Sequence, residues 1–72
     1  MRPVKRSFSI KGHSTSISLE AEFWDALKAA AGEDRVPLAQ LVAEIDNGRG
    51  GSGLSSAVRV WLLKRYQAKS AR

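Results

Sequence analysis

The sequence changes its hydrophobic period at Leu19, and this change restricts the fold more than any other feature. Before Leu19, serine alternates with Thr15 and Ile17, which is the spacing of a strand with one packed face and one solvent-exposed face. After Leu19, the apolar residues recur at helical spacing. The sequence therefore predicts a strand over 14–19 that runs directly into an amphipathic helix over 20–31.

A strand on its own leaves backbone N–H and C=O groups without partners, so the strand over 14–19 needs a mate. The chain has 72 residues, no cysteine and one histidine, so no disulfide and no metal site of its own can reinforce its small core. We expect the strand to pair with the same strand of a second copy. This pairing gives an intertwined homodimer with an antiparallel ribbon between its subunits.

A hairpin within one chain is the rival interpretation, in which Lys11 and Gly12 form the turn and residues 4–10 pair with 13–19. The apolar residues of 4–10 lie at even positions, whereas those of 13–19 lie at odd positions. A continuous strand through both segments needs a phase slip near Gly12. We therefore expect a break there and interpret 1–12 as a basic arm.

The expected fold class is mostly α-helical with one short strand. Gly32 is predicted to end the first helix, because glycine adopts the left-handed conformation without strain. The second helix carries a complete i, i+3, i+4, i+7 apolar stripe, formed by Leu38, Leu41, Val42 and Ile45. In chain order, the predicted elements are a basic arm over 1–12, a strand over 14–19, helices over 20–31 and 37–46, a glycine-rich loop over 47–53, a third helix over 55–67 and a basic tail over 68–72.

The third predicted helix is apolar most of the way round. Trp61 belongs to its main apolar face, and Val60 and Leu63 widen that face. A helix of this kind is usually covered on more than one side. This pattern favours packing between subunits, or an exposed apolar surface that binds a protein partner.

Charge is distributed unevenly along the chain, which has a net charge of +5. Residues 1–19 contain four basic residues and no acid, 20–46 contain all seven acids with two basic residues, and 47–72 contain six basic residues and no acid. Basic ends around an acidic middle favour a polyanionic partner. Nucleic acid is the main candidate, and an anionic membrane or an acidic protein is the alternative.

Several classes of protein are not favoured by the sequence. Its longest apolar runs are too short to cross a bilayer, and the N-terminus lacks the apolar stretch of a secretion signal. We therefore expect a cytoplasmic protein with no membrane association. No catalytic set can be assembled from its residues, so we expect neither an enzyme nor a cofactor.

Two motifs resemble the ribbon-helix-helix proteins, in particular a small bacterial group of ribbon-helix-helix domain proteins. The first motif is GHSTSISLEAEFW at 12–24, and the second is LSSAVR at 54–59. The resemblance covers most of the chain. It implies a ribbon of two strands, one from each subunit, that enters the major groove of DNA, and a second helix whose N-terminus anchors a phosphate.

The resemblance also implies roles for particular residues. The serines of the strand face DNA, and the first N–H groups of the second helix hold the phosphate; the alternative for the serines is a solvent-exposed strand face. The long basic side chains reach phosphate or guanine edges, or else belong to a disordered arm, and the histidine has a packing or capping role as its alternative. The DNA-binding candidates are Arg6, Lys11, His13, Ser14, Ser16, Ser18, Leu38 and Ala39. The expected dimer core is Thr15, Ile17, Leu19, Leu41, Val42, Ile45 and Trp61.

The favoured function is that of a homodimeric transcriptional regulator that binds double-stranded DNA. Its sequence specificity is expected to be weak, because a serine hydroxyl both donates and accepts hydrogen bonds and discriminates bases poorly. The alternative is a protein-interaction module of antitoxin type that binds one protein partner through the C-terminal helix. An RNA-binding or nucleoid-coating role is a third, weaker hypothesis.

Overall fold

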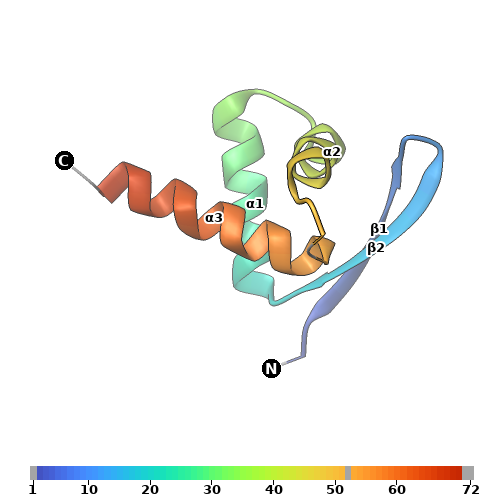
Figure 1. Ribbon diagram of the computed structural model, residues 1–72. Helices are drawn as coiled ribbons and strands as arrows, with labels where there is room; N and C mark the ends of the chain where they lie inside the picture. Colours follow the sequence, from blue (N-terminus) through green and yellow to red (C-terminus); the bar gives the residue numbers. More distant parts are fainter. Residues whose placement is uncertain (1, 52, 71–72) are drawn as a thin grey trace.

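The computed structural model describes residues 2–51 and 53–70 and contains two strands followed by three helices (Figure 1). In chain order, the elements are β1 (Val4–Ile10), β2 (His13–Leu19), α1 (Ala21–Asp34), α2 (Leu38–Gly48) and α3 (Leu54–Ser70). The prediction of a mostly helical fold is confirmed, although it included one strand and the structure has two. Residue 1 of the predicted arm, residue 52 of the predicted loop and residues 71–72 of the predicted tail lie outside the described residues.

β1 and β2 form an antiparallel hairpin in which Ile10 pairs with His13 beside a two-residue turn (Figure 1). The turn residues Lys11 and Gly12 have φ values of 54° and 79°. Positive φ at both positions is the condition of a type I′ turn, whose twist matches that of the flanking strands. The strand over 14–19 therefore has its mate within its own chain. The prediction that its mate comes from a second copy is wrong, and the rival hairpin interpretation is correct.

The register explains why the sequence pattern around the turn was misread. Each pair joins an even-numbered residue of β1 to an odd-numbered residue of β2, or the reverse, as in Arg6 with Ile17 and Phe8 with Thr15. Paired residues point to the same face of the sheet. The even apolar positions of β1 and the odd apolar positions of β2 therefore form one face. The change of parity at Gly12 is the pattern that a two-residue hairpin requires, and it is not a phase slip.

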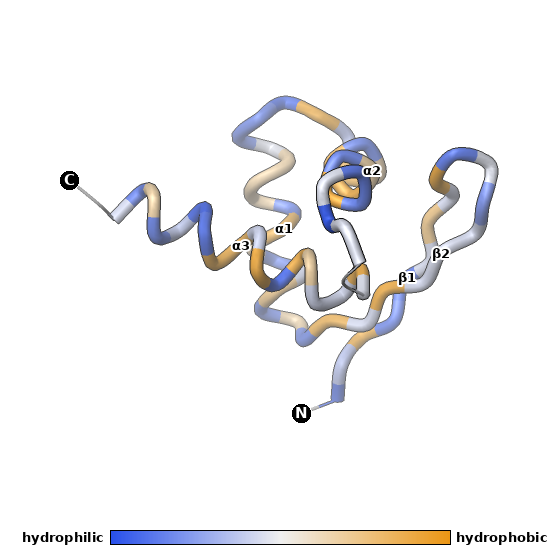
Figure 2. Tube along the Cα trace, viewed as in Figure 1, coloured by the Kyte–Doolittle hydropathy of each residue, from blue (hydrophilic) through white to orange (hydrophobic). Residues whose placement is uncertain are grey.

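The three helices pack against this apolar face and bury one core. Ile17 and Leu19 of β2 are completely buried, and Ile10 is buried at the end of β1. The buried indole of Trp24 donates a hydrogen bond from Nε1 to the carbonyl of Val4 at 2.8 Å, which fixes α1 to the start of β1. Hydrophobic residues recur along all three helices (Figure 2). They supply the other buried residues: Leu27, Ala30, Ala31, Leu41, Val42, Ile45, Leu54, Val58 and Leu62.

α1 ends later than predicted. Gly32 lies inside the helix, and Arg35 takes the left-handed conformation at its C-terminus with a φ of 57°. The N–H of Arg35 bonds to the carbonyl of Gly32 at 3.2 Å, and the N–H of Val36 bonds to the carbonyl of Ala31 at 3.0 Å. These bonds satisfy the last carbonyls without a glycine at the end of the helix. α2 and α3 also extend beyond their predicted ends at 46 and 67.

α3 packs on its own chain. Val58 and Leu62 are buried in the core, and Arg65 forms ion pairs with Glu33 at 2.8 Å and Asp34 at 3.0 Å at the end of α1. One side of α3 therefore covers α1, α2 and the end of the hairpin within a single subunit. Among the described residues, no helix has the combination of length and apolarity that a membrane span requires.

Candidate nucleic-acid interface

The outer face of the hairpin is a row of serine side chains with one lysine at its end. Three cross-strand pairs form it, and they are Lys5 with Ser18, Ser7 with Ser16, and Ser9 with Ser14. We call these six residues the serine face. The side chain of Ser18 is half-buried and the other five are exposed. The Oγ atoms of Ser7 and Ser16 lie 3.3 Å apart, so one hydroxyl donates to the other across the ribbon.

The serine face contains three predicted residues and three that the sequence reasoning missed. Ser14, Ser16 and Ser18 lie on one face of β2, as expected from their alternation. The missed residues come from β1, which was interpreted as an arm: Lys5, Ser7 and Ser9. Polar and apolar residues alternate over 4–10, and this alternation indicates a strand with one polar face. In a hairpin, that polar face lies beside the serines of β2.

Arg6 lies on the opposite face from the serines. It pairs with Ile17, and its guanidinium carbon lies 5.4 Å from the ring centroid of Trp24. Phe8 packs on the same indole, with the ring centroids 6.0 Å apart. Arg6 is thus engaged in a cation–π contact on the helix-facing side of the hairpin, at its margin.

Lys11 and His13 lie at the turn of the hairpin. Both are exposed, and the Nζ of Lys11 donates a hydrogen bond to Oδ1 of Asn47 near the C-terminus of α2. His13 pairs with Ile10, so it shares the helix-facing side and not the serine face. The bond to Asn47 directs Lys11 toward the C-terminus of α2.

The N-terminus of α2 lies away from the turn. Asn47 contacts the turn, and Leu38 and Ala39 start the same helix about 13 Å away along its axis. Pro37 precedes them in an extended conformation with no side-chain cap, and its carbonyl accepts the N–H of Leu41 at 3.1 Å. The predicted phosphate anchor is therefore separate from the turn of its own hairpin.

The end of β2 is held by α3. The backbone N–H of Ser18 donates to Oγ of Ser55 at 3.2 Å, and its carbonyl accepts from Nη2 of Arg59 at 3.5 Å. The same guanidinium pairs with Glu20 at 3.1 Å and lies 5.7 Å from the ring centroid of Phe23. Arg59 thus joins α3 both to the end of β2 and to Glu20, the residue before α1.

The charge of the hairpin is entirely positive. Residues 1–19 contain no acid, and Glu20 is the first carboxylate of the chain. A hydrogen bond from its own backbone N–H and, second, the Arg59 guanidinium hold the pKa of Glu20 below its usual range. An anionic ligand on the serine face therefore contacts Lys5 and serine hydroxyls. The carboxylate that is nearest in sequence, Glu20, is already paired with Arg59.

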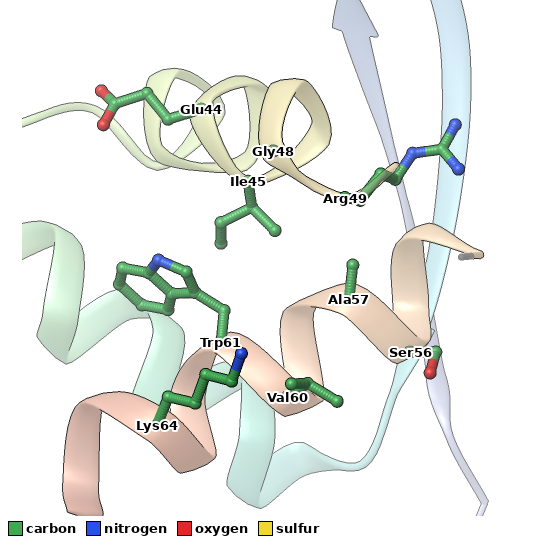
Figure 3. Close-up of a pocket in the computed structure, with 9 residues that line it drawn as sticks. All are labelled: Glu44, Ile45, Gly48, Arg49, Ser56, Ala57, Val60, Trp61 and Lys64. Carbon is green, nitrogen blue, oxygen red and sulfur yellow. The ribbon is translucent and has the colours of Figure 1, made fainter. Parts of the chain in front are cut away.

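Two grooves flank α3. The groove between α2 and α3 has a volume of about 430 Å³, and Figure 3 shows Ile45 and Trp61 projecting into it from its two walls. Its charged lining residues are Glu44, Arg49 and Lys64, and Arg49 is paired with Asp46 at 2.6 Å. The second groove lies between α1 and α3. In the part of the chain that the structure describes, no group of three potential metal ligands is found.

The residues predicted to form a dimer core are found inside one subunit. Ile17, Leu19, Leu41, Val42 and Ile45 are buried by their own chain. The other two, Thr15 and Trp61, are half-buried. We expected this core to form only between two copies. It is instead largely buried within one copy, because the hairpin and α3 pack against it.

Comparison with known protein families gives a match. A family described as ribbon-helix-helix domain matches residues 3–66, which include β1, β2, α1, α2 and most of α3. No curated protein and no solved structure gives a match.

Proposed function

Because this chain belongs to the ribbon-helix-helix domain family, we propose that it is a homodimeric DNA-binding protein, a cytoplasmic transcriptional regulator that places its serine face in the major groove. Ribbon-helix-helix domains are typically non-enzymatic and dimeric, and they act as DNA-binding transcriptional regulators or antitoxins. The observation that carries the proposal is the serine face itself, which presents hydroxyls and Lys5 on a segment without any acid.

The dimensions of the hairpin support this proposal. The major groove of B-DNA admits a two-stranded ribbon, and the hairpin of a single chain already has two strands. The exposed hydroxyls of Ser14 and Ser16 can donate to or accept from base edges, while Lys5, Lys11 and Arg2 neutralise phosphates. In this arrangement the basic residues provide affinity, and the serines provide a weak preference among sequences.

The N-terminus of α2 has a separate role in the proposal. The free N–H groups of Leu38 and Ala39 bind a backbone phosphate beside the groove, with help from the helix dipole. Pro37 lacks an N–H, so this anchor has one donor fewer than a helix that begins with serine. We expect it to contribute less than the hairpin does.

The salt dependence of binding tests the proposal. If a dimer neutralises about six phosphates through Arg2, Lys5 and Lys11 of both copies, log K falls with log salt with a slope on the order of −5. The measurement is fluorescence anisotropy with a labelled duplex between 50 and 300 mM salt, using competition by double-stranded RNA to test the RNA-binding hypothesis. Binding that is insensitive to salt, or that prefers RNA, contradicts the proposal.

A protein-interaction module of antitoxin type is the second candidate. Val60, Leu63 and Tyr66 support it, because these large apolar side chains are about half exposed on one side of α3. Capture of one stoichiometric protein partner, with no retardation of duplex DNA at low salt, favours this function over DNA binding.

A further inference from the structure

The groove between α1 and α3 is lined mainly by apolar side chains and has a volume of about 380 Å³. Val60, Leu63 and Tyr66 on its α3 wall are 46%, 57% and 50% exposed. We call it the α1–α3 groove. Its volume is in the range of the clefts that bind small organic molecules. Its lining residues all belong to the two helices, and they are Glu22, Phe23, Ala26, Arg59, Val60, Leu62, Leu63 and Tyr66.

The apolar surface of the α1–α3 groove is continuous across its two walls. Val60, Leu63 and Tyr66 recur every three residues along α3, so they form one stripe. Phe23 and Ala26, which are half-buried, continue this surface on the α1 wall. Apolar surface gathered in this way is stabilised when a ligand removes it from water.

The positive charge that lines the groove is already compensated. Arg59 pairs with Glu20 at 3.1 Å, and its Nη2 also donates to the carbonyl of Ser18 at 3.5 Å. Its guanidinium carbon lies 5.7 Å from the ring centroid of Phe23, in a cation–π contact. An anionic ligand in the groove would therefore have to compete with Glu20 for this guanidinium.

The negative charge that lines the groove comes from Glu22. This residue is exposed in the first turn of α1, and no hydrogen bond or ion pair joins its side chain to another described residue. Glu22 and Arg59 are the two charged residues of the lining. Since Arg59 is paired with Glu20, the groove presents the carboxylate of Glu22 beside apolar surface.

This combination selects a ligand that has an apolar body and a positive charge. Burial of the apolar body provides affinity, and the carboxylate of Glu22 favours a cation over an anion of the same shape. The hairpin does not compete for such a ligand, because residues 1–19 contain four basic residues and no acid. A single carboxylate in a cleft of this volume matches a small molecule with a single positive charge.

We propose that the α1–α3 groove binds a small hydrophobic cation, an organic molecule in which aromatic or aliphatic groups surround an ammonium or phosphonium centre. Its apolar groups lie against Leu63 and Tyr66, and its positive charge lies beside the carboxylate of Glu22. The proposed function assigns no ligand to this groove. The site is lined by residues other than those of the serine face, and its ligand is opposite in charge to DNA.

Two probes of the same shape and opposite charge test the site. Tetraphenylphosphonium is the cation and tetraphenylborate is the anion, and each is titrated into the isotope-labelled full chain while the amide shifts are followed by NMR. Tetraphenylphosphonium should shift the amides of Phe23, Ala26 and Leu63 and leave those of Ser14 and Ser16 unchanged. Tetraphenylborate should need higher concentrations to shift the amides of the groove.

The charge of the site is tested by substitution on α1. Glu22→Gln should weaken the binding of tetraphenylphosphonium about threefold to fivefold, the upper range for a pair of exposed charges, and should not weaken the binding of tetraphenylborate. The matched control is Asp25→Asn, which removes an exposed acid of the same helix that does not line the groove. This control should leave the dissociation constants of both probes nearly unchanged.

The apolar surface is tested by substitution on α3. Leu63→Ser removes apolar contact and no charge, so it should weaken both probes by a similar factor of about five or more. Leu63 is mostly exposed, so the circular dichroism of the variant should match that of the wild type. The control is Ala68→Ser, at an exposed position of α3 outside the groove, which should bind both probes as the wild type does.

Several results overturn the proposal. Equal effects of Glu22→Gln and Asp25→Asn mean that the carboxylate in the groove does not hold the cation. Groove amides that stay unshifted by tetraphenylphosphonium, because a second copy or a protein partner covers them, also exclude the site, and saturation only in the millimolar range marks adventitious binding. Since the titrations contain no DNA, their results are independent of the proposed function.

Discussion

The backbone N–H of Ser18 donates a hydrogen bond to the hydroxyl of Ser55 at 3.2 Å. This bond joins the outer edge of β2 to the first turn of α3, which are far apart in sequence. Arg59 reinforces the same junction through the carbonyl of Ser18 and the carboxylate of Glu20. The serine face is thus held at one end by α3, and at the other by the contact of Lys11 with Asn47.

Removing the hydroxyl at this junction should destabilise the protein. Ser55→Ala leaves a half-buried N–H without a partner, so we expect the free energy of unfolding to fall by about 1–2 kcal/mol. Urea unfolding followed by circular dichroism measures it. The control is Ser56→Ala, an exposed neighbour, which should change stability by less than about 0.5 kcal/mol. Equal effects of the two substitutions contradict the assigned role.

Two glycine substitutions should change stability in opposite directions. A Cβ at Gly12 or Gly32 meets no atom within 4 Å, so only the backbone conformation decides the effect. Gly12→Ala forces alanine to a φ of +79° and should cost about 1 kcal/mol, whereas Gly32→Ala lies inside α1 and should stabilise by about 0.5–1 kcal/mol. Thermal or urea unfolding of both variants checks this. A neutral Gly12→Ala indicates that the turn is not of the type described.

The two faces of β1 should respond differently in DNA binding. Lys5→Ala removes the lysine of the serine face and should weaken binding to all duplexes and reduce the salt slope by about 1 for each copy. Arg6→Ala lies on the other face against Trp24 and should leave the slope unchanged while lowering stability by about 0.5–1 kcal/mol. Anisotropy titrations of both variants at several salt concentrations measure these effects. The reverse result places the DNA on the opposite face of the hairpin.

Sequence preference should depend on the hydroxyls. We expect Ser16→Ala to reduce the differences in affinity between duplexes of different sequence more than it reduces their mean affinity. Lys11→Ala, at the turn, should lower the affinity for every duplex by a similar factor. The comparison needs a panel of duplexes at one salt concentration, and a uniform loss for Ser16→Ala would place this serine outside base recognition.

Stability should fall in acid through the ion pairs of α1 with α3. Lys69 at 2.6 Å and, second, Arg65 at 2.8 Å hold the pKa of Glu33 below its usual value of 4.5. Since this pKa is lower in the folded state than in the unfolded state, the contribution is fully present above 4.5 and is lost as the pH falls through the folded value. Urea unfolding from pH 7 to pH 3 should show this decline, with a smaller decline for Glu33→Gln. Identical pH profiles contradict the assignment.

Local patterns predicted much of the fold. The alternation of serine predicted β2, and the apolar stripe that starts at Leu38 predicted α2. Each pattern repeats within a single element, so it can be recognised without knowledge of the rest of the fold. The mate of β2 was not predicted, since the parity change at Gly12 fits both a broken strand and a hairpin. The end of α1 was missed because Arg35, not Gly32, takes the left-handed conformation, with the last turn also held by ion pairs from α3.

Half of the residues of the candidate site could be predicted from the sequence. Ser14, Ser16 and Ser18 follow from alternation within one strand, but Lys5 and its neighbours in β1 depend on a pairing that no local pattern decides. The position of Arg6 depends on the same register. A contact such as Ser18 with Ser55 depends on how α3 crosses the sheet, and no spacing along the chain encodes it.

The two-residue turn at Lys11 and Gly12 also has a kinetic consequence. Hairpins that close through so short a loop form on a timescale on the order of microseconds, in a first-order process that does not depend on protein concentration. Because both strands belong to one chain, the hairpin forms without a second copy. In the proposed dimer, dilution separates the two copies but leaves each one with an assembled hairpin.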